Sequence, residues 1–310
     1  MAGLRKVCIL LFASFLSYLS IQNVKPDEIT TKRIVPLKGV CYSPFRDNQS
    51  PETGNFPSLN EISEDLNIIE KYAENIRTYG NDNVLFEIPR LCDEKNIRID
   101  VGAWLSRDYS FNNESINNLI QIANSGYKSV KGLIVGSETL LRNDLTKAEL
   151  ISYINQVKNS TSIPVTTAEG WYFWLNNRDL ADYVDYLTVH IHPYWEGVSI
   201  DNAVSFVIEK YNLVKSTYPD KRVVIGETGW PSGGAINKAS IPSEENQVRF
   251  VREFRDAAAR NNIDYFIFEM FDEKWKEKYG EVEGHWGIFY SSREIKPLLE
   301  DALSVFSRFD

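Results

Sequence analysis

The sequence predicts a single-domain (β/α)8 barrel of the TIM class, on three observations. The 310 residues are 43% hydrophobic, which is enough to form one large buried core. Eight apolar runs alternate with segments of helical periodicity, and several runs are almost continuously apolar, as strands buried on both faces are. No Gly-rich turn follows the first run, as a nucleotide-binding open sheet would require, so a closed barrel is favoured over a doubly wound sheet.

The eight predicted strands and the helices between them can be placed in chain order. The strands are 35–43, 75–80, 98–106, 132–138, 164–171, 185–193, 222–230 and 264–272. Apolar residues recur at helical spacing at Ile62, Leu66, Ile69 and Ala73, at Leu150, Ile154 and Val157, at Val248, Val251 and Phe254, and at Ile295, Leu298, Leu299, Ala302 and Leu303. Thr146 and Glu149 have the spacing of a capping box, and Pro242–Ser243 precedes the seventh helix. Residues 47–60, rich in polar residues, Pro and Gly, are expected to form the loop after the first strand.

Residues 1–22 have the composition of a secretory signal peptide. Arg5 and Lys6 precede an apolar run that is short for a membrane span. The cleavage site is poor, so an uncleaved anchor formed by residues 7–21 stays open as the alternative. We therefore expect a secreted or cell-surface protein that contacts a membrane only through this segment, with the barrel domain over 34–310.

The net charge argues against one class of partner, and the two cysteines of the barrel domain bear on whether it contains a disulfide bond. The formal net charge of −9 argues against a nucleic-acid partner, because no basic surplus is available to neutralise phosphates. Cys41 and Cys92 are interpreted as buried free thiols, with a single disulfide as the alternative in an exported chain. A monomer is expected.

The predicted strand ends are rich in acids and aromatic residues, and in such barrels the active site lies at the C-terminal ends of the strands. These residues are Tyr42, Ser43, Arg77, Tyr79, Trp104, Ser137, Glu138, Glu169, Trp171, His190, His192, Tyr194, Trp195, Glu227, Trp230, Glu269 and Asp272. Aromatic faces stack on sugar rings, and acids bind sugar hydroxyls. The set therefore predicts a carbohydrate substrate.

Glu138 and Glu227 each follow directly on an apolar run, GLIVGSE and RVVIGE, three βα units apart. Cleavage of a glycosidic bond needs one protonated and one ionised carboxyl group flanking the bond. Two glutamates on different strands of one barrel can meet this need. The structural alternative is a pair of acids at the barrel mouth, each neutralised by Arg or Lys.

Five segments resemble glycoside hydrolase family 17, and the resemblance extends over about residues 34–305. They are GLIVGSETLLR, TTAEGWYFWL, VDYLTVHIHPYWEG, VVIGETGWPSGG, and YFIFEMFDEKWK with EGHWGIF. The likeness is to bacterial and fungal members that act on β-1,3-glucan. It implies a (β/α)8 barrel, retention of anomeric configuration, no metal and no cofactor, and hydrolysis or transglycosylation of β-1,3-glucan.

The resemblance also assigns residues to roles. Glu138 matches the family's acid/base and Glu227 its nucleophile, whereas Tyr42 and Trp230 match aromatic residues of the cleft floor. The predicted substrate-binding residues are Tyr42, Arg77, Tyr79, Ser137, Glu169, Trp171, His192, Tyr194, Trp195, Trp230, Glu269, Glu273 and Lys276. A retaining pair predicts carboxyl groups about 5–5.5 Å apart, a raised pKa for the acid/base and an ionised nucleophile.

Two features of the predicted site need separate interpretation: Ser137, which departs from the family's usual residue, and the HIH sequence, which resembles a metal-binding pattern. Ser137 stands where the family usually has an Asn that bonds the sugar hydroxyl next to the anomeric carbon. A shorter side chain predicts a weaker contact, and the alternative function is a glycan-binding barrel with weak or lost turnover. The HIH sequence is a ligand pattern of metal-dependent hydrolases, but His285 is the only other histidine, so no metal is expected. His192 is interpreted as a cleft residue, and His190 as buried with satisfied ring nitrogens.

Overall fold

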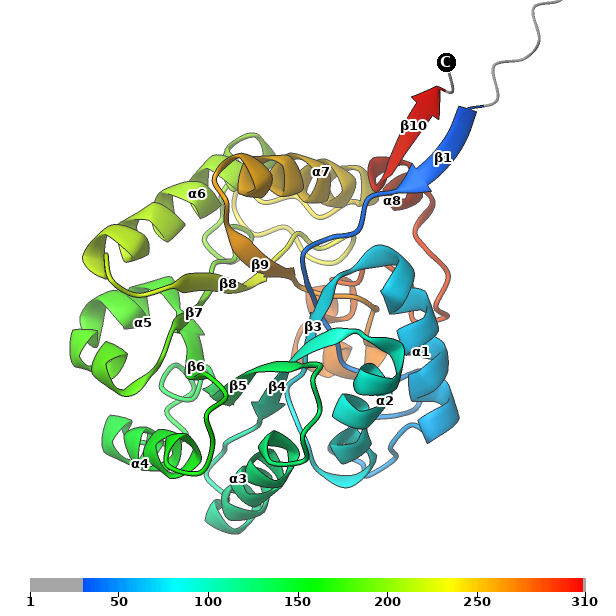
Figure 1. Cartoon of the computed structure of the whole chain (residues 1–310). Helices are drawn as coiled ribbons and strands as arrows, with labels where there is room; N and C mark the ends of the chain where they lie inside the picture. The colour runs from blue at the N-terminus through cyan, green and yellow to red at the C-terminus, as the bar shows by residue number, and fades with distance from the viewer. Residues whose placement is uncertain (1–29, 309–310) are drawn as a thin grey trace, which may run out of the picture.

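The computed structural model describes residues 30–308, and β2 to β9 within them form a closed barrel of parallel strands in sequential order. Figure 1 shows the strands around a central axis with the helices outside them. The barrel strands are β2 (Val40–Cys41), β3 (Asn75–Arg77), β4 (Arg98–Ala103), β5 (Val130–Ser137), β6 (Val165–Gly170), β7 (Leu187–His190), β8 (Val223–Thr228) and β9 (Asp264–Ile267). The predicted (β/α)8 barrel is confirmed, and each strand lies inside its predicted run and is shorter than it, except β5, which begins two residues before its run.

Helices follow the barrel strands and pack around them. They are α1 (Leu59–Tyr72), α2 (Ile88–Lys95), α3 (Tyr109–Ala123), α4 (Lys147–Lys158), α5 (Trp171–Asn176), α6 (Ile200–Thr217), α7 (Glu244–Arg260) and α8 (Pro297–Ala302). Four 3-10 helices, η1 (Asn83–Glu87), η2 (Arg178–Tyr183), η3 (Lys274–Tyr279) and η4 (Glu281–Gly284), lie in the connections. The predicted capping box of Thr146 and Glu149 starts α4, and Ser243 caps α7.

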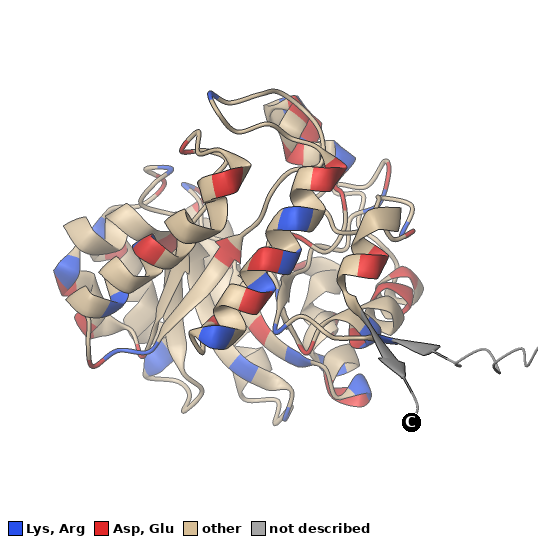
Figure 2. Ribbon diagram, turned by 90° about the horizontal axis from the view of Figure 1, so that it is seen from above, with Lys and Arg blue, Asp and Glu red and all other residues tan. Residues whose placement is uncertain are grey.

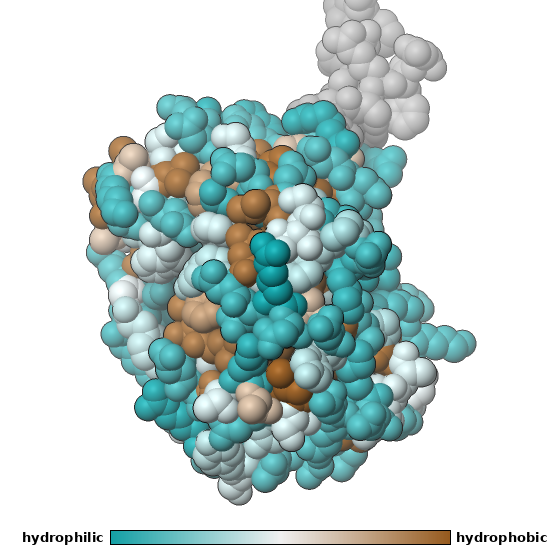
Figure 3. All heavy atoms as spheres, turned by 90° about the vertical axis from the view of Figure 1, so that its left-hand side faces the viewer, coloured by the Kyte–Doolittle hydropathy of each residue, from teal (hydrophilic) through white to brown (hydrophobic). Residues whose placement is uncertain are grey.

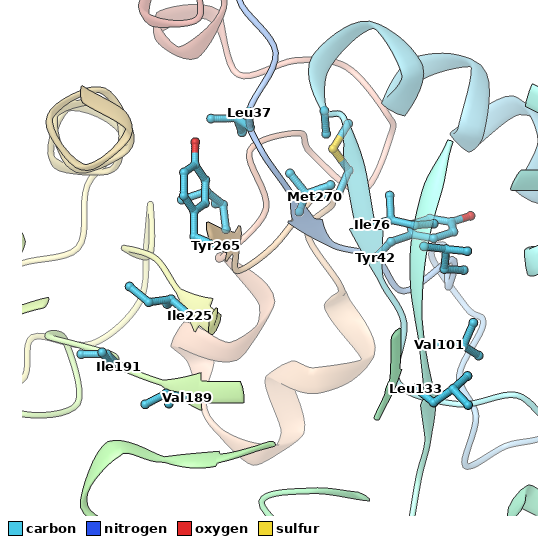
Figure 4. Packing of buried hydrophobic residues seen from close by; sticks show 14 of the residues in the cluster. Leu37, Tyr42, Ile76, Val101, Leu133, Val189, Ile191, Ile225, Tyr265 and Met270 are labelled. Carbon is cyan, nitrogen blue, oxygen red and sulfur yellow. The ribbon is translucent and has the colours of Figure 1, made fainter. Parts of the chain in front are cut away.

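The described residues form three buried hydrophobic clusters, the third of which comprises Tyr194, Val282 and Trp286. The largest cluster fills the layer between the strands and the helices. Figure 4 shows Ile76, Val101, Leu133, Val189 and Ile225 pointing outward from their strands into this layer. A smaller cluster of Cys41, Tyr186, Val224 and Phe266 packs together separately from it.

Both described cysteines are buried free thiols, as predicted. The Cys41 thiol donates a hydrogen bond to the carbonyl oxygen of Gly226 on β8 at 3.3 Å. Burial raises the pKa of both thiols above their usual value of 9.0, so neither is a reactive thiolate.

A two-stranded antiparallel sheet outside the barrel was not predicted. Its strands β1 (Thr30–Ile34) and β10 (Ser304–Arg308) bring the two ends of the described chain together beside α8 (Figure 1). The predicted signal peptide or anchor at residues 1–22 lies outside the described residues. Within residues 30–308, no helix is both long and apolar enough to cross a bilayer.

Charged and apolar side chains are interspersed on the faces of the molecule in view. Figure 2 shows Lys and Arg residues alternating with Asp and Glu along the helices. Figure 3 shows the side that carries α5 and α6, where apolar residues form separate patches among polar ones. Trp195, Ile236 and Tyr279 are exposed and lie in loops after β7, β8 and β9.

Candidate active site

A cleft of about 680 Å³ lies at the C-terminal ends of the barrel strands. Its walls come from the segments that follow β2, β3, β4, β5, β8 and β9. The predicted site residues that line it are Tyr42, Tyr79, Ser137, Glu138, Glu227, Glu273 and Lys276. The cleft therefore holds both predicted catalytic residues, but only part of the predicted substrate-binding set.

The backbone after β5 turns Glu138 toward the cleft. Glu138 has a φ of 53°, in the left-handed region that few non-glycine residues adopt, and Gly136 has a φ of 77°. The Glu138 amide donates to the Ala168 carbonyl oxygen at 2.7 Å. Behind this turn the buried Glu169 carboxylate accepts from the Leu140 amide at 2.8 Å. The turn is thus fixed on both sides by contacts with β6.

The Glu227 carboxylate is surrounded by hydrogen-bond donors. Its Oε1 atom accepts from the Arg77 guanidinium at 3.0 Å and from the Tyr79 hydroxyl at 2.9 Å. His192 Nε2 lies 3.1 Å from its Oε2 atom. Donors placed in this way stabilise the ionised form of the carboxyl group.

Arg77 is fully buried and connects the parts of the site. One of its terminal nitrogens, Nη1, donates to Glu227, to the Gly226 carbonyl oxygen at 2.9 Å and to His190 Nε2 at 2.7 Å. The other, Nη2, donates to Ser137 Oγ at 2.8 Å. The prediction that Arg77 binds substrate is wrong, because the guanidinium is committed to protein groups beneath the cleft.

His190 joins the two predicted catalytic residues. Its Nδ1 atom is 2.8 Å from Glu138 Oε1, and its Nε2 atom faces Arg77, which can only donate. We therefore assign a neutral ring that carries its proton on Nδ1 and donates it to Glu138. His190 is buried with both nitrogens satisfied, as predicted, but its partners are groups of the active site.

One carboxylate oxygen from each of Glu138 and Glu227 and one nitrogen of His190 lie within 4.8 Å of one another. Such a group could in principle hold a metal ion. The Arg77 charge and the proton on His190 Nδ1 oppose metal binding there, because they remove the lone pair and repel a cation. The short separation of the carboxylate oxygens is the kind expected of a retaining pair.

Both carboxyl groups have a lowered pKa in the free cleft. Burial raises the pKa of Glu227, but the charge of Arg77 and the hydrogen bond from His192 hold it well below 4.5. Burial also raises the pKa of Glu138, and the hydrogen bond from His190 outweighs it, so the pKa lies below 4.5. The raised pKa predicted for Glu138 is therefore wrong for the free cleft, because the sequence did not reveal the His190 contact.

These pKa directions predict an acidic pH optimum for kcat/KM. A Glu138 acid must be protonated, so kcat/KM should fall as the pH rises through its lowered pKa, while ionised Glu227 sets an acid limb at still lower pH. Bound sugar excludes water from Glu138 and should raise its pKa, so the alkaline limb of kcat should lie at higher pH than that of kcat/KM. Rate profiles of both constants between pH 2.5 and about 8 measure this.

The variant His190→Ala is the matched comparison for this profile. It removes the donor that lowers the Glu138 pKa, so the alkaline limb of kcat/KM should move to higher pH. A wild-type limb above about pH 6, near the unperturbed range of histidine, would contradict the assignment to Glu138.

A second charged cluster lines the cleft after β9. Lys276 Nζ lies between Glu269 and Glu273, at 2.7 Å from Glu269 and in direct contact with Glu273. Glu273 also accepts from the Ser43 hydroxyl at 2.6 Å and the Trp275 indole at 2.8 Å. Burial raises the pKa of Glu269, whereas Lys276 and the hydroxyl and indole donors outweigh burial and lower that of Glu273. The positive charge of Lys276 is thus balanced by one ionised acid, Glu273, while Glu269 is protonated more readily.

The remaining predicted binding residues do not line the cleft, although His192 and Glu269 lie directly behind its wall, bonded to Glu227 and Lys276. The full set is Arg77, Glu169, Trp171, His192, Tyr194, Trp195, Trp230 and Glu269. Trp230 and Tyr194 are buried, and their polar atoms donate to the Ile241 and Ala235 carbonyl oxygens. The prediction that Trp230 forms the cleft floor is wrong, because its ring packs against Tyr194 and Phe250.

Several cleft residues were not predicted as site residues. Trp104, which directly follows β4 and was named at its strand end without a binding role, lines the cleft with the Arg142 guanidinium stacked 4.1 Å from its ring. Arg142 also donates to the Leu105 carbonyl oxygen at 2.9 Å. Glu283 and Trp275 come from the long connection after β9. Position at a strand end had indicated Trp104, but nothing in the sequence marks which loop residues fold back over the barrel.

Comparison with known proteins gives consistent matches. The chain matches the family described as the BtgE/BtgC glycoside hydrolase domain over residues 39–287. A btgC protein of Aspergillus niger is 32% identical over 294 aligned residues, which cover 84% of this chain and 42% of the relative. A glucan endo-1,3-beta-glucosidase btgC of Emericella nidulans is 28% identical, over 84% of this chain and 45% of the relative. The chain therefore spans less than half the length of these curated relatives.

Solved structures of known proteins also match this chain. The glycoside hydrolase family 17 β-1,3-glucanosyltransferase of Rhizomucor miehei is 32% identical, with a TM-score of 0.76 over 85% of this chain and 96% of that one. An active-site mutant of that transferase is in complex with laminaritriose. The cleft described above therefore lies within the region shared with a solved structure at this identity.

Proposed function

Because the chain belongs to glycoside hydrolase family 17, we propose that it cleaves or transglycosylates β-1,3-glucan with retention of anomeric configuration. The observation that supports this most directly is the pair of glutamates at the strand ends. Their oxygens lie within 4.8 Å of each other, and their surroundings differ. Glu227 faces three donors and suits a nucleophile, whereas Glu138 has its side chain about 30% exposed to the cleft and suits proton exchange.

In the proposed first step, Glu227 attacks the anomeric carbon while Glu138 protonates the leaving oxygen. The bond from the anomeric carbon to the leaving sugar breaks, and an ester bond to Glu227 forms. Arg77 and Tyr79 hold the attacking carboxylate, and His190 orients the carboxyl group of Glu138. Groups that are already positioned in this way lower the activation free energy, because little reorganisation is needed to reach the transition state.

In the second step, the ionised Glu138 removes a proton from the acceptor oxygen, which attacks the same carbon and releases Glu227. Water as acceptor gives hydrolysis, and a sugar hydroxyl gives transglycosylation. The relatives' names include both an endo-glucosidase and a glucanosyltransferase. We propose that both outcomes occur here.

The test of this function is product analysis with a linear β-1,3-gluco-oligosaccharide. Mass spectrometry should detect shorter products, and longer ones if transfer occurs, while proton NMR should show the β anomer first. First appearance of the α anomer, or no turnover with β-1,3-linked substrates, would contradict the proposal.

Ser137 raises the alternative of a glycan-binding barrel with weak turnover. Its hydroxyl accepts from Arg77 Nη2 and is 6% exposed in the cleft wall, so it is poorly available to sugar. Ser137→Asn should retain an acceptor for Arg77 and add an amide donor toward the reacting sugar. Because glycosidase transition-state contacts contribute on the order of several kcal/mol, we expect roughly a tenfold or greater gain in kcat.

Hydrolysis and transfer products of wild type, Ser137→Asn and Ser137→Ala, measured side by side, check this expectation. Ser137→Ala is the matched control, since it removes the Arg77 contact without adding a donor, and kcat should fall. A loss of both activities in Ser137→Asn would instead mean that the cleft is specialised for the smaller side chain.

The N-terminal segment and the assembly state are part of the proposal. We propose that residues 1–22 direct export to the cell surface or medium, where β-glucan would be met, and that the protein acts as a monomer. The apolar run after Arg5 and Lys6 supports export.

A further inference from the structure

The loop after β2 and the segment after β9 are joined by two ion pairs at the rim of the cleft. Lys274 Nζ lies 2.6 Å from Asp47 Oδ2, and Lys278 Nζ contacts Glu52 Oε2. The four side chains are each 40–56% exposed. We call these four residues the loop bridge. Its partners lie far apart in sequence, so it fixes the relative position of the first and last connections of the barrel.

Aromatic residues beside the loop bridge form a continuous wall of the cleft. The ring centroids of Phe45 and Trp275 are 6.1 Å apart, and those of Trp275 and Tyr279 are 6.4 Å apart. The Trp275 indole is held by its bond to Glu273. Phe45, Trp275 and Tyr279 line the cleft, and so does Glu52, so the aromatic wall and this member of the loop bridge face the same space.

Strand order shows which part of a bound glucan would meet this wall. In the closed barrel β9 lies four strands from β5 in either direction, so the segment after β9 is opposite the turn that carries Glu138. The leaving sugar must contact Glu138. The sugars retained on Glu227, which lies near the C-terminal end of the neighbouring strand β8, therefore extend toward the side of β9 and β2. This is the donor side of the cleft.

We propose that the loop bridge limits the number of donor sugars that the cleft accepts, and so sets the length of the unit that is released or transferred. This inference rests on the proposed function, because the roles of Glu138 and Glu227 define the donor side. A longer donor chain would have to separate both ion pairs to pass the aromatic wall.

The charges needed for this role are present at acidic pH. The hydrogen bond from Lys274 lowers the pKa of Asp47, and the same bond raises that of Lys274. Exposed ion pairs are weak and are screened by salt, so the loop bridge can be opened by modest changes. Product length should therefore depend on ionic strength as well as on sequence.

The experiment measures donor-unit length with linear β-1,3-gluco-oligosaccharides labelled at the reducing end, by mass spectrometry. The wild type should release or transfer one dominant unit length. The variant Asp47→Lys/Glu52→Lys places four lysines together and should shift products to longer units. The four-fold swap, with Lys274→Glu and Lys278→Glu added, restores opposite charges and should restore the wild-type pattern. High salt should act like the opened variant.

Asp179→Lys is the matched control, because it breaks the exposed pair with Lys147 at 2.7 Å, away from the cleft, and should leave product length unchanged. Thermal unfolding of every variant shows that the fold is retained. An unchanged product pattern in the folded, opened variant overturns the inference, as does a swap that fails to restore the pattern or a wild type without a dominant length. Absence of any turnover by the wild type would instead overturn the proposed function.

Discussion

Replacing Glu227 by Ala should lower kcat on the order of 10⁴-fold, as removal of catalytic groups does in well-studied hydrolases. The covalent step is lost, while the fold should survive because Arg77, the buried donor to the carboxylate, has other partners. Arg77 keeps the Gly226 carbonyl oxygen, His190 and Ser137. The measurement is initial rate on a β-1,3-gluco-oligosaccharide, with thermal unfolding as the check on folding.

Azide gives this variant a diagnostic control. It can occupy the space left by the carboxylate and attack the anomeric carbon from the same side, so activity should partly return as an α-configured glycosyl azide. Glu209→Ala, which removes an exposed acid on α6, should leave the rate unchanged. A Glu227→Ala variant that keeps more than about a tenth of wild-type activity would place the nucleophile elsewhere, since a lost catalytic group typically costs at least 10²-fold.

Arg77→Met should have the second largest effect, although Arg77 does not line the cleft. The variant removes four donated hydrogen bonds and the charge that faces Glu227. Breaking a buried pair by removing one partner destabilises a protein by about 3–5 kcal/mol, so a clear fall in melting temperature is expected. We expect kcat to fall about 10²-fold or more, because the nucleophile loses both its orientation and its counter-charge.

The pH dependence separates an electrostatic role of Arg77 from a purely structural one. Its charge lowers the Glu227 pKa, so removing it raises that pKa and reduces the ionised fraction at low pH. The acid limb of kcat should therefore move to higher pH in Arg77→Met. Arg77→Lys keeps a charge but not the planar fork, so it should move the limb less. If the acid limb of kcat does not move in either variant, Arg77 has only a structural role.

The fold was predictable because periodicity and strand ends are local features. Runs such as RVVIGE and GLIVGSE are long, apolar and flanked by helical patterns, and each became a strand buried on both faces. The lengths of all the barrel strands except β5 were overestimated, because hydrophobic runs continue into loops that pack on the core. The β1–β10 pair was missed, since pairing of two chain ends depends on where the barrel leaves them.

The site was predictable only where a residue's position on its strand decides its direction. Glu138 and Glu227 reach the cleft because they end strands. Arg77 ends a strand as well, yet it is buried, because its length lets it reach across to β7 and β8 beneath the cleft. His190 on β7 contacts both Glu138 after β5 and Glu227 on β8. This contact requires three strands to place their ends at the same height in the barrel, and no single sequence pattern encodes that alignment.

The left-handed backbone at Glu138 places activity and stability in competition at one position. A non-glycine residue held in such a conformation costs on the order of 1–3 kcal/mol, and Asn or Gly adopts it more readily. On the proposed function, selection for turnover would keep the acid there in spite of that cost. Where such selection relaxes, drift should favour Asn or Gly, since the chain gains stability as it loses activity. The residue at this turn would then mark which lineages of the family still depend on catalysis.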